Sequence, residues 1–185
     1  MNTAQATDPA RLIREACEEG RLLAKTELLR LLRERPAAPD APALPLEGLE
    51  EEIAASLAGD PDLAVVHGPD GGEFYRCAGL MSATYAGILA GRSAPCLLMA
   101  ETVRTNSKEY PRPIALDIFE YPPFDLDPES IRACLQRMAA DADFGDISFV
   151  ESSAGTVYLF SKTYLDRDYA TFLAERLDVD LALNP

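Results

Sequence analysis

Between residues 102 and 113 the sequence gathers residue types that bind anions. Arg104, Lys108 and Arg112 supply three positive charges, and Asn106 and Tyr110 lie between them as neutral hydrogen-bonding groups. Guanidinium and ammonium groups bind carboxylates and phosphates through charge-assisted hydrogen bonds. We therefore predict that these five residues contact an anionic ligand or an acidic partner protein. The alternative is a merely solvated loop, because connections between antiparallel strands are exposed by default.

Enzymatic chemistry has little support. His67 is the only histidine of the sequence, so a mechanism that needs a pair of histidines is excluded. The glycine-rich phosphate loop, the serine nucleophile elbow and the zinc-protease motif are all absent. Asp141, Asp143 and Asp146 do not match the ligand spacing of a calcium loop, and we interpret them as a polar turn. We predict no catalytic residue, no metal site and no cofactor.

The cysteines show no metal-binding or redox spacing. Cys17, Cys77, Cys96 and Cys134 are scattered, and no C-x-x-C pair occurs. We predict four reduced, mostly buried thiols that pack as small apolar residues.

A second candidate surface is aromatic. If residues 114–121 and 156–161 form strands, alternation sends Phe119, Tyr121, Tyr158 and Phe160 to the sheet face opposite the helices. Aromatic groups on an open face mark an interface, so we predict that this face binds a second copy or a partner protein. Coverage by the N-terminal helices is the alternative.

Charge restricts the class of partner. The chain has 185 residues, 17 basic and 31 acidic side chains, and a net charge of −14. Residues 46–75 carry eight acidic and no basic side chains, whereas residues 76–112 carry five basic and two acidic ones. Such a protein repels phosphate backbones, so we expect no nucleic-acid partner.

The elements before residue 78 predict a helical N-terminal region. Apolar spacing indicates helices over residues 9–19, 26–35 and 46–59, with four prolines in the linker at residues 36–45. Two β-prone runs, residues 63–67 and 73–77, flank a glycine-rich turn. Three helices followed by a hairpin resemble the winged-helix superfamily over residues 9–77. The resemblance implies that the third helix occupies the recognition position, but its glutamates disfavour DNA there.

The elements after residue 77 predict a second domain. A connecting helix is expected within residues 78–95. Residues 96–104 and 114–121 read as one strand pair, and residues 147–151 and 156–161 as another. Each pair is followed by a helix, capped by Asp127 and by Asp166 respectively, which gives a ββαββα order over residues 96–185. We predict the α+β class, with a four-stranded antiparallel sheet that carries two helices on one face.

Together these features favour a non-catalytic accessory, adaptor or regulatory protein that works through protein–protein contacts. A sensor that binds a small anionic ligand near residues 104–112 is the alternative, and an enzyme that uses a cysteine or a carboxylate comes third. No apolar stretch is long enough to cross a membrane, and residues 1–8 lack a secretion signal, so we expect a cytoplasmic protein.

Overall fold

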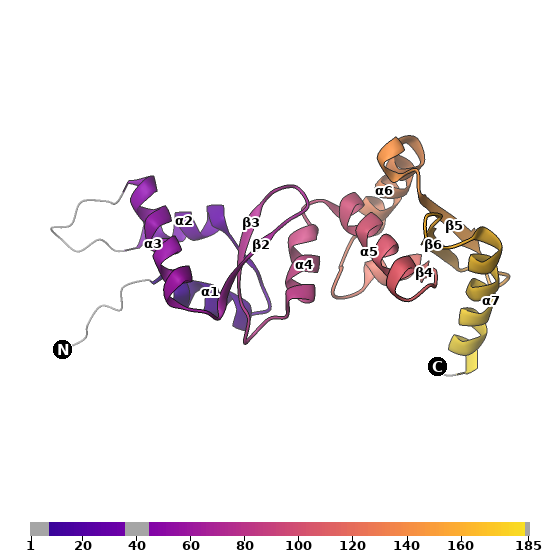
Figure 1. Ribbon diagram of the computed structural model, residues 1–185, viewed down its shortest axis with the longest axis horizontal. Coiled ribbons are helices and arrows are strands. Elements are labelled where there is room, and N and C mark those ends of the chain that lie inside the picture. Colours follow the sequence, from indigo (N-terminus) through magenta and orange to yellow (C-terminus); the bar gives the residue numbers. More distant parts are fainter. Residues whose placement is uncertain (1–7, 36–44, 184–185) are drawn as a thin grey trace. The chain divides into compact units, whose positions relative to one another are not determined.

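The computed structural model describes residues 8–35 and 45–183 of the chain. The chain divides into two compact units, residues 1–93 (unit 1) and residues 94–185 (unit 2), which Figure 1 draws in sequence colours. Within the described part, seven α-helices and two three-stranded antiparallel sheets confirm the predicted α+β class. The predicted linker, residues 36–45, lies outside the described residues except for Pro45.

Unit 1 begins with two helices that are joined through a short strand. The elements are α1 (Pro9–Glu18), β1 (Leu23–Ala24) and α2 (Lys25–Glu34). The carboxylate of Asp8 caps α1 by accepting a hydrogen bond from the Ala10 N–H at 3.3 Å. Both helices follow the predicted spacing, whereas β1 lies in a stretch for which no strand was predicted.

A helix, a hairpin and a further helix complete unit 1. The elements are α3 (Leu46–Gly59), β2 (Leu63–His67), β3 (Glu73–Cys77) and α4 (Ala83–Gly91). The hairpin is confirmed at the predicted residues, and Gly71 supplies the positive φ of +83° that its turn requires. The strand order is β1-β3-β2, and α4 packs against β2, so the predicted connecting helix belongs to unit 1.

The core of unit 1 lies between its first three helices and its sheet. The helices contribute Ile13, Leu28, Leu32 and Leu49, each at most 2% exposed. The sheet closes this core with Leu23, Leu63 and Tyr75.

Unit 2 alternates helices with short strands. The elements are α5 (Pro95–Glu109), β4 (Ile114–Ala115), the 3-10 helix η1 (Leu116–Glu120), α6 (Pro128–Ala140), the 3-10 helix η2 (Ala142–Phe144), β5 (Ile147–Glu151), β6 (Val157–Ser161) and α7 (Arg167–Leu183). The predicted aspartate caps are confirmed. Asp127 Oδ1 accepts from the Ser130 N–H at 2.9 Å, and Asp166 Oδ1 accepts from the Asp168 N–H at 2.9 Å.

The first predicted strand pair of unit 2 is wrong. Residues 96–104 lie inside α5, because Pro95 stands at the first helical position and Leu98, Met99 and Val103 bury one helical face. The second predicted strand keeps only Ile114–Ala115 before the chain turns into η1. The ββαββα order and the four-stranded sheet are therefore replaced by a three-stranded sheet of order β4-β6-β5.

The helices of unit 2 cover both faces of its sheet, which corrects the prediction of helices on one face. α5 packs against β6, and α7 packs against β5. Tyr158 and Phe160 share a buried cluster with Ala170 and Ala174 of α7. On the other face, the Ser161 N–H donates to Ser107 Oγ of α5 at 3.0 Å. The sheet is thus the middle layer of three.

A disulfide joins Cys96 of α5 to Cys134 of α6, with the two Cα atoms 4.9 Å apart. The prediction of four reduced cysteines is wrong for this pair, whose members lie 38 residues apart in the sequence. Cys17 and Cys77 are free and buried. Among the described residues, no helix is both long enough and apolar enough to cross a membrane.

Removal of this disulfide is expected to destabilise unit 2. A cross-link that closes a loop of 38 residues limits the unfolded chain, which corresponds to roughly 3–4 kcal/mol in the chain-entropy model. The double variant Cys96→Ala/Cys134→Ala should lose about this free energy of unfolding in urea denaturation. Reductant should lower the stability of the wild type and leave the variant unchanged. The thiols of the wild type can be counted with a thiol reagent after unfolding without reductant. A count of four would contradict the disulfide, which leaves two free thiols.

Candidate interaction surfaces

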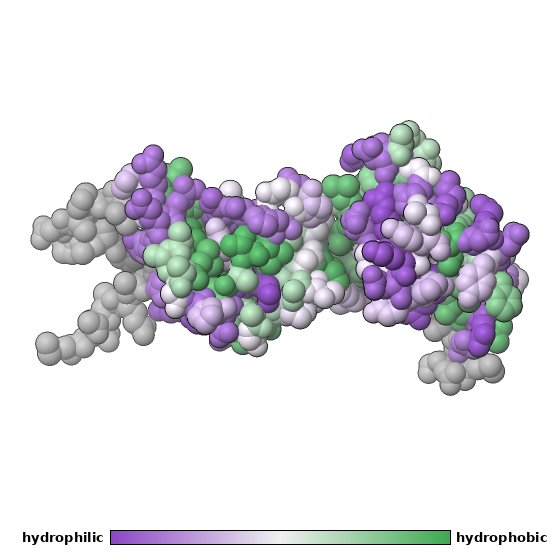
Figure 2. All heavy atoms as spheres, viewed as in Figure 1, coloured by the Kyte–Doolittle hydropathy of each residue, from purple (hydrophilic) through white to green (hydrophobic). Residues whose placement is uncertain are grey.

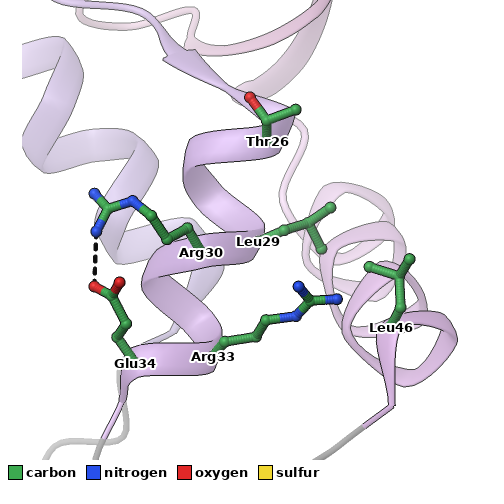
Figure 3. A pocket seen from close by; sticks show the side chains of 6 residues that line it. All are labelled: Thr26, Leu29, Arg30, Arg33, Glu34 and Leu46. Atoms are coloured by element: carbon green, nitrogen blue, oxygen red, sulfur yellow. Dashed lines mark hydrogen bonds and ion pairs between the residues drawn. The ribbon is translucent and has the colours of Figure 1, made fainter.

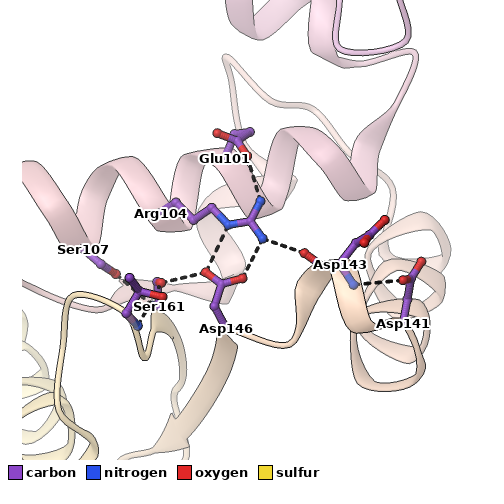
Figure 4. Close-up of polar contacts among 8 residues, drawn as sticks. Glu101, Arg104, Ser107, Asp141, Asp143, Asp146 and Ser161 are labelled. Atoms are coloured by element: carbon purple, nitrogen blue, oxygen red, sulfur yellow. Dashed lines mark hydrogen bonds and ion pairs between the residues drawn. The ribbon is translucent and has the colours of Figure 1, made fainter.

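Arg104 lies on α5 and is enclosed by carboxyl and carbonyl oxygens, as Figure 4 shows. Its Nε donates to Asp146 Oδ2 at 3.0 Å, and its Nη2 donates to Asp146 Oδ1 at 2.6 Å. Nη1 donates to Glu101 Oε1, and Nη2 also donates to the backbone oxygen of Asp143, both at 2.8 Å. The guanidinium is therefore occupied within the fold. Arg104 does not lie in a loop, and its predicted role as an anion contact is not supported.

Asp146 extends this contact to the sheet. The Ser161 hydroxyl donates to Asp146 Oδ2 at 2.7 Å, and the backbone oxygen of Asp146 accepts from the Lys162 N–H at 2.7 Å. Hydrogen bonds from Arg104 and Ser161 hold the pKa of Asp146 below its usual value, although partial burial acts in the opposite direction. We call Arg104, Asp146 and Ser161 the polar hub; it joins α5 to β6 and to the turn before β5.

The other predicted contact residues lie at the end of α5 and just beyond it. Tyr110 is 65% exposed, and the Arg112 guanidinium stacks over its ring at 5.7 Å. The Asn106 side chain donates to the backbone oxygen of Arg112 at 2.9 Å, which ties the loop back to the helix. Lys108 is exposed. The structure thus brings Asn106, Tyr110 and Arg112 together, and Lys108 lies on the last turn of α5. We name Lys108, Tyr110 and Arg112 the α5-end patch.

The acidic segment, residues 46–75, is partly neutralised inside unit 1. Bases from residues 1–45 bind half of its eight carboxylates, in the ion pairs Lys25–Glu50, Lys25–Glu73, Arg35–Glu52 and Arg14–Asp60. Asp70 accepts hydrogen bonds from the Gly72 N–H and the Ser93 hydroxyl, which lower the pKa of its carboxyl. Glu47, Glu51 and Asp62 are exposed. The acidic segment therefore stabilises the packing of its own unit and presents fewer charges than the sequence implies.

An open groove of about 410 Å³ lies between α2 and the start of α3 in unit 1. Figure 3 shows the residues that line it, which are Thr26, Leu29, Arg30, Arg33, Glu34 and Leu46. Arg30 is ion-paired to Glu34 at 2.7 Å, whereas Arg33 extends toward Leu46, which is 46% exposed. The sequence could not indicate this groove, because its two walls come from helices on either side of the linker.

A second groove of the same size lies beside the hairpin turn, and His67 is among the residues that line it. His67 is exposed and ends β2. No cluster of three or more potential metal-ligating side chains was found among the described residues. Cys17 and Cys77 come together in the core of unit 1, where Cys17 Sγ accepts from the Cys77 N–H at 3.2 Å and burial raises the pKa of the Cys17 thiol.

The predicted aromatic interface is not a surface. Phe119 and Phe160 are 0% exposed and Tyr158 is 2% exposed, whereas Tyr121 is 62% exposed. Alternation along β6 was anticipated correctly, but α7 covers the face that was expected to be open, and Phe119 lies in a 3-10 helix. The Tyr158 hydroxyl donates to Asp178 Oδ1 of α7 at 2.7 Å. Burial and this carboxylate raise the pKa of Tyr158.

Other aromatic residues are exposed in their place. Tyr169 and Phe172 of α7 are 50% and 58% exposed, and their rings stack at 6.4 Å. Phe149 of β5 is 60% exposed. The exposure of these three residues could not be predicted, because an apolar residue on an amphipathic element is usually buried. Figure 2 shows hydrophobic spheres among hydrophilic ones over α7, and a mainly hydrophilic face over the rest of unit 2.

Comparisons with known proteins match the division of the fold. Residues 93–182 match the family model of the YdhW C-terminal domain, and this range coincides with unit 2. The chain is also similar to the uncharacterized protein YdhW of Escherichia coli (strain K12), with 29% identity over 144 residues. The match covers 74% of this chain and 66% of that protein, just under two thirds of its length. Because the matched stretch of 144 residues is longer than unit 2, the similarity extends into unit 1. No solved structure matches the chain.

Substitution of Arg104 is expected to destabilise unit 2. Arg104→Gln leaves the partly buried Asp146 without its cation, which should cost about 2 kcal/mol of unfolding free energy at neutral pH. The lowered pKa of Asp146 means that this stabilisation is fully present above the ordinary carboxyl pKa of about 3.9 and is lost as the pH falls through the lowered value. Urea denaturation of both proteins over this range measures the difference.

The exposed Arg112 provides the matched control. Arg112→Gln removes the same charge from the same region and should change the stability by less than about 0.5 kcal/mol. Equal costs for the two substitutions, or a difference that persists in strong acid, would show that the polar hub does not hold unit 2 together.

Proposed function

We propose that the protein is a non-catalytic accessory protein that holds an acidic segment of a partner protein at the α5-end patch. The observation that carries this proposal is the contrast between two sets of cations on one helix. The guanidinium of Arg104 is fully occupied by partners within the fold, whereas Lys108 and Arg112 are exposed and have no ion pair within the described residues. Arg112 also stacks over the exposed ring of Tyr110.

The local charge and the ring at this patch, rather than the charge of the whole unit, support an acidic partner. Unit 2 carries eight basic and sixteen acidic side chains, so long-range steering by the whole unit does not favour an anion. Binding must then depend on short-range contacts, for which an aromatic ring stacked under a guanidinium is well suited. Arg and Tyr are also the residue types that contribute most to protein interfaces.

We further propose that unit 1 is a winged helix that serves as a packing module. The element order α1-β1-α2-α3-β2-β3 and the strand order β1-β3-β2 support this interpretation. In a DNA-binding winged helix, the helix at the position of α3 lies in the major groove, between the two phosphate backbones. Here α3 carries four glutamates and no basic residue, and two of these glutamates form ion pairs with Lys25 and Arg35.

The cytosolic location stays a prediction. A disulfide such as Cys96–Cys134 is unusual in a reducing compartment.

Photo-crosslinking tests the α5-end patch. A photoreactive phenylalanine analogue at Tyr110 should give a discrete protein adduct in an extract of the native cells. The adduct should fall at least about tenfold when Lys108→Glu and Arg112→Glu are added, since two attractive contacts become repulsive. Arg132→Glu, an exposed charge reversal on α6, is the matched control and should leave the yield unchanged.

The outcomes separate the candidate functions. An adduct that survives the Lys108→Glu/Arg112→Glu change, or no adduct at all, would refute the proposed contact. A rise in melting temperature with phosphate or citrate that the same double variant abolishes would instead support the alternative of a small-anion sensor.

The packing role of unit 1 predicts that DNA is not bound. Fluorescence anisotropy with a labelled duplex should show no binding at low salt, where electrostatic attraction to DNA is strongest. Saturable binding of the duplex by the wild type would contradict this expectation, and a change of that binding in Glu47→Lys/Glu51→Lys would assign it to α3.

A further inference from the structure

Strand β5 has an open edge. It pairs with β6 on one side, and among the described residues no strand pairs with its other side. Its five residues, Ile147–Glu151, contain no lysine, no proline and one charged side chain. Proteins usually protect such edges with charges, prolines or bulges, because an open edge pairs readily with another strand. The lack of these features indicates that β5 meets a partner.

The hydrogen bonds of β5 identify the groups that face this edge. The Lys162 N–H donates to the Asp146 oxygen, and the Ser152 N–H donates to the Thr156 oxygen at 3.0 Å. Because backbone groups alternate in direction along an antiparallel strand, the even-numbered residues of this segment face β6. The N–H and C=O groups of Ile147, Phe149 and Glu151 therefore point to the open side.

Helix α7 lies over the same strand and leaves large apolar side chains exposed. One face, with Ala170 and Ala174 at 0% exposure, packs on the sheet. The outer side carries the stacked pair Tyr169 and Phe172, with Val179 at 56% exposure two turns beyond Phe172, among exposed charged side chains. We call Tyr169, Phe172 and Val179 the exposed stripe. Large apolar side chains that are exposed near one another mark an interaction surface.

The exposed stripe lies on the side of α7 that is turned away from β6. Asp178 accepts from the hydroxyl of Tyr158 and also interacts with Ser152 and Thr156, so its side of the helix faces β6 and the turn between β5 and β6. Tyr169 precedes Asp178 by nine residues and, at about 100° per residue, lies on the opposite side of α7. Phe172 and Arg176 lie within about 60° of Tyr169. Because α7 packs on β5, which is the edge strand, the side of the helix away from β6 is the side nearer the open edge.

We infer that a second copy of this chain pairs with β5 and with the exposed stripe of α7 in a twofold dimer. A twofold axis through Phe149 pairs the two β5 strands antiparallel, with Phe149 opposite its copy and Ile147 opposite Glu151. This arrangement satisfies about six backbone hydrogen bonds and joins two three-stranded sheets into one. It also brings the two copies of α7 together on one face of that sheet and the two Phe149 rings together on the other.

The chemistry of the stripe suits its own copy. Arg176 is exposed among the aromatic residues of α7, so a guanidinium of one protomer can stack on a ring of the other. A fully buried aromatic side chain removes about 150–250 Å² from water. Because the aromatic residues Phe149, Tyr169 and Phe172 are 50–60% exposed, each can still bury about 100 Å². With the strand edge, each copy contributes less than the roughly 800 Å² of a standard interface, so the dimer should be weak, with a Kd of about 10–100 µM.

Sedimentation velocity of the full chain, from about 5 µM to about 500 µM, tests the inference. The mass should change from monomer to dimer across this range. Phe149→Lys places a charge on the open edge and should raise the Kd at least about tenfold, as should Tyr169→Glu/Phe172→Glu. Their melting temperatures should stay close to that of the wild type, since all three side chains are exposed.

Val65 gives a matched control. It is 41% exposed on β2, which is also an edge strand, but in unit 1. Val65→Lys should leave the Kd unchanged. In a second experiment, a short bis-maleimide should cross-link Phe149→Cys to its own copy, because the two Cα atoms of such a pair lie about 5.5 Å apart, and it should not cross-link Val65→Cys.

Three results would overturn the inference: a monomer at every concentration, a dimer that the Phe149 and α7 variants leave intact, or a dimer that Val65→Lys alone disrupts. The last of these would assign the contact to β2. None of these measurements involves the α5-end patch, so they do not depend on the proposed accessory function.

Discussion

The bidentate contact between Arg104 and Asp146 determines how unit 2 is assembled. A guanidinium that is only 26% exposed must find enough acceptors to replace water, and here it finds two carboxylates and a carbonyl. Because Asp146 also accepts from Ser161, the same charge pair holds α5 against one face of the sheet and orients the turn that leads into β5. The backbone oxygen of Asp146 accepts from Lys162 and so extends the pairing of β5 with β6 by one residue, and α7 packs on the other face of that strand pair.

The high negative charge of the chain has a different meaning in each unit. In unit 1, half of the carboxylates in the acidic segment bind bases that come from α1, α2 and the residues beside them. Arg14, Lys25 and Arg35 therefore hold α3 and the residues that follow it in place. In unit 2 the acidic side chains outnumber the basic ones two to one, and several of them cap helices or bind hydroxyl groups. The net charge is largely a by-product of how the helices are fixed.

The elements that could be predicted are those whose signals are local. Asp127 followed by Pro128, and two apolar runs around a glycine turn, specify a cap and a hairpin without reference to the rest of the chain. Residues 96–104 were misassigned because a short apolar run fits a buried strand and a buried helix equally well, and Pro95 was the one signal that separates the two. The two-residue strands β1 and β4 are too short to leave a pattern.

The candidate surfaces were harder to predict because they depend on distant partners. Nothing near Arg104 in the sequence indicates Asp146, which lies 42 residues away. The disulfide and the burial of the aromatic face of β6 depend on distant partners in the same way. Cys134 lies 38 residues from Cys96, and α7 covers that face. The exposure of Lys108, Tyr110 and Arg112 was predictable, because a polar stretch that follows an apolar run usually lies at the surface, and their role as contacts stays a prediction.

The disulfide also has a mechanical consequence, because of where it joins α5. Cys96 is the second residue of that helix and lies three residues after the last residue of unit 1. A force that reaches unit 2 through this connection meets a covalent bond almost at once and passes into the middle of α6. The segment that the disulfide closes, residues 97–133 with β4, is thereby shielded from tension along the chain, whereas β5 and β6 follow Cys134 and stay in the path of the force.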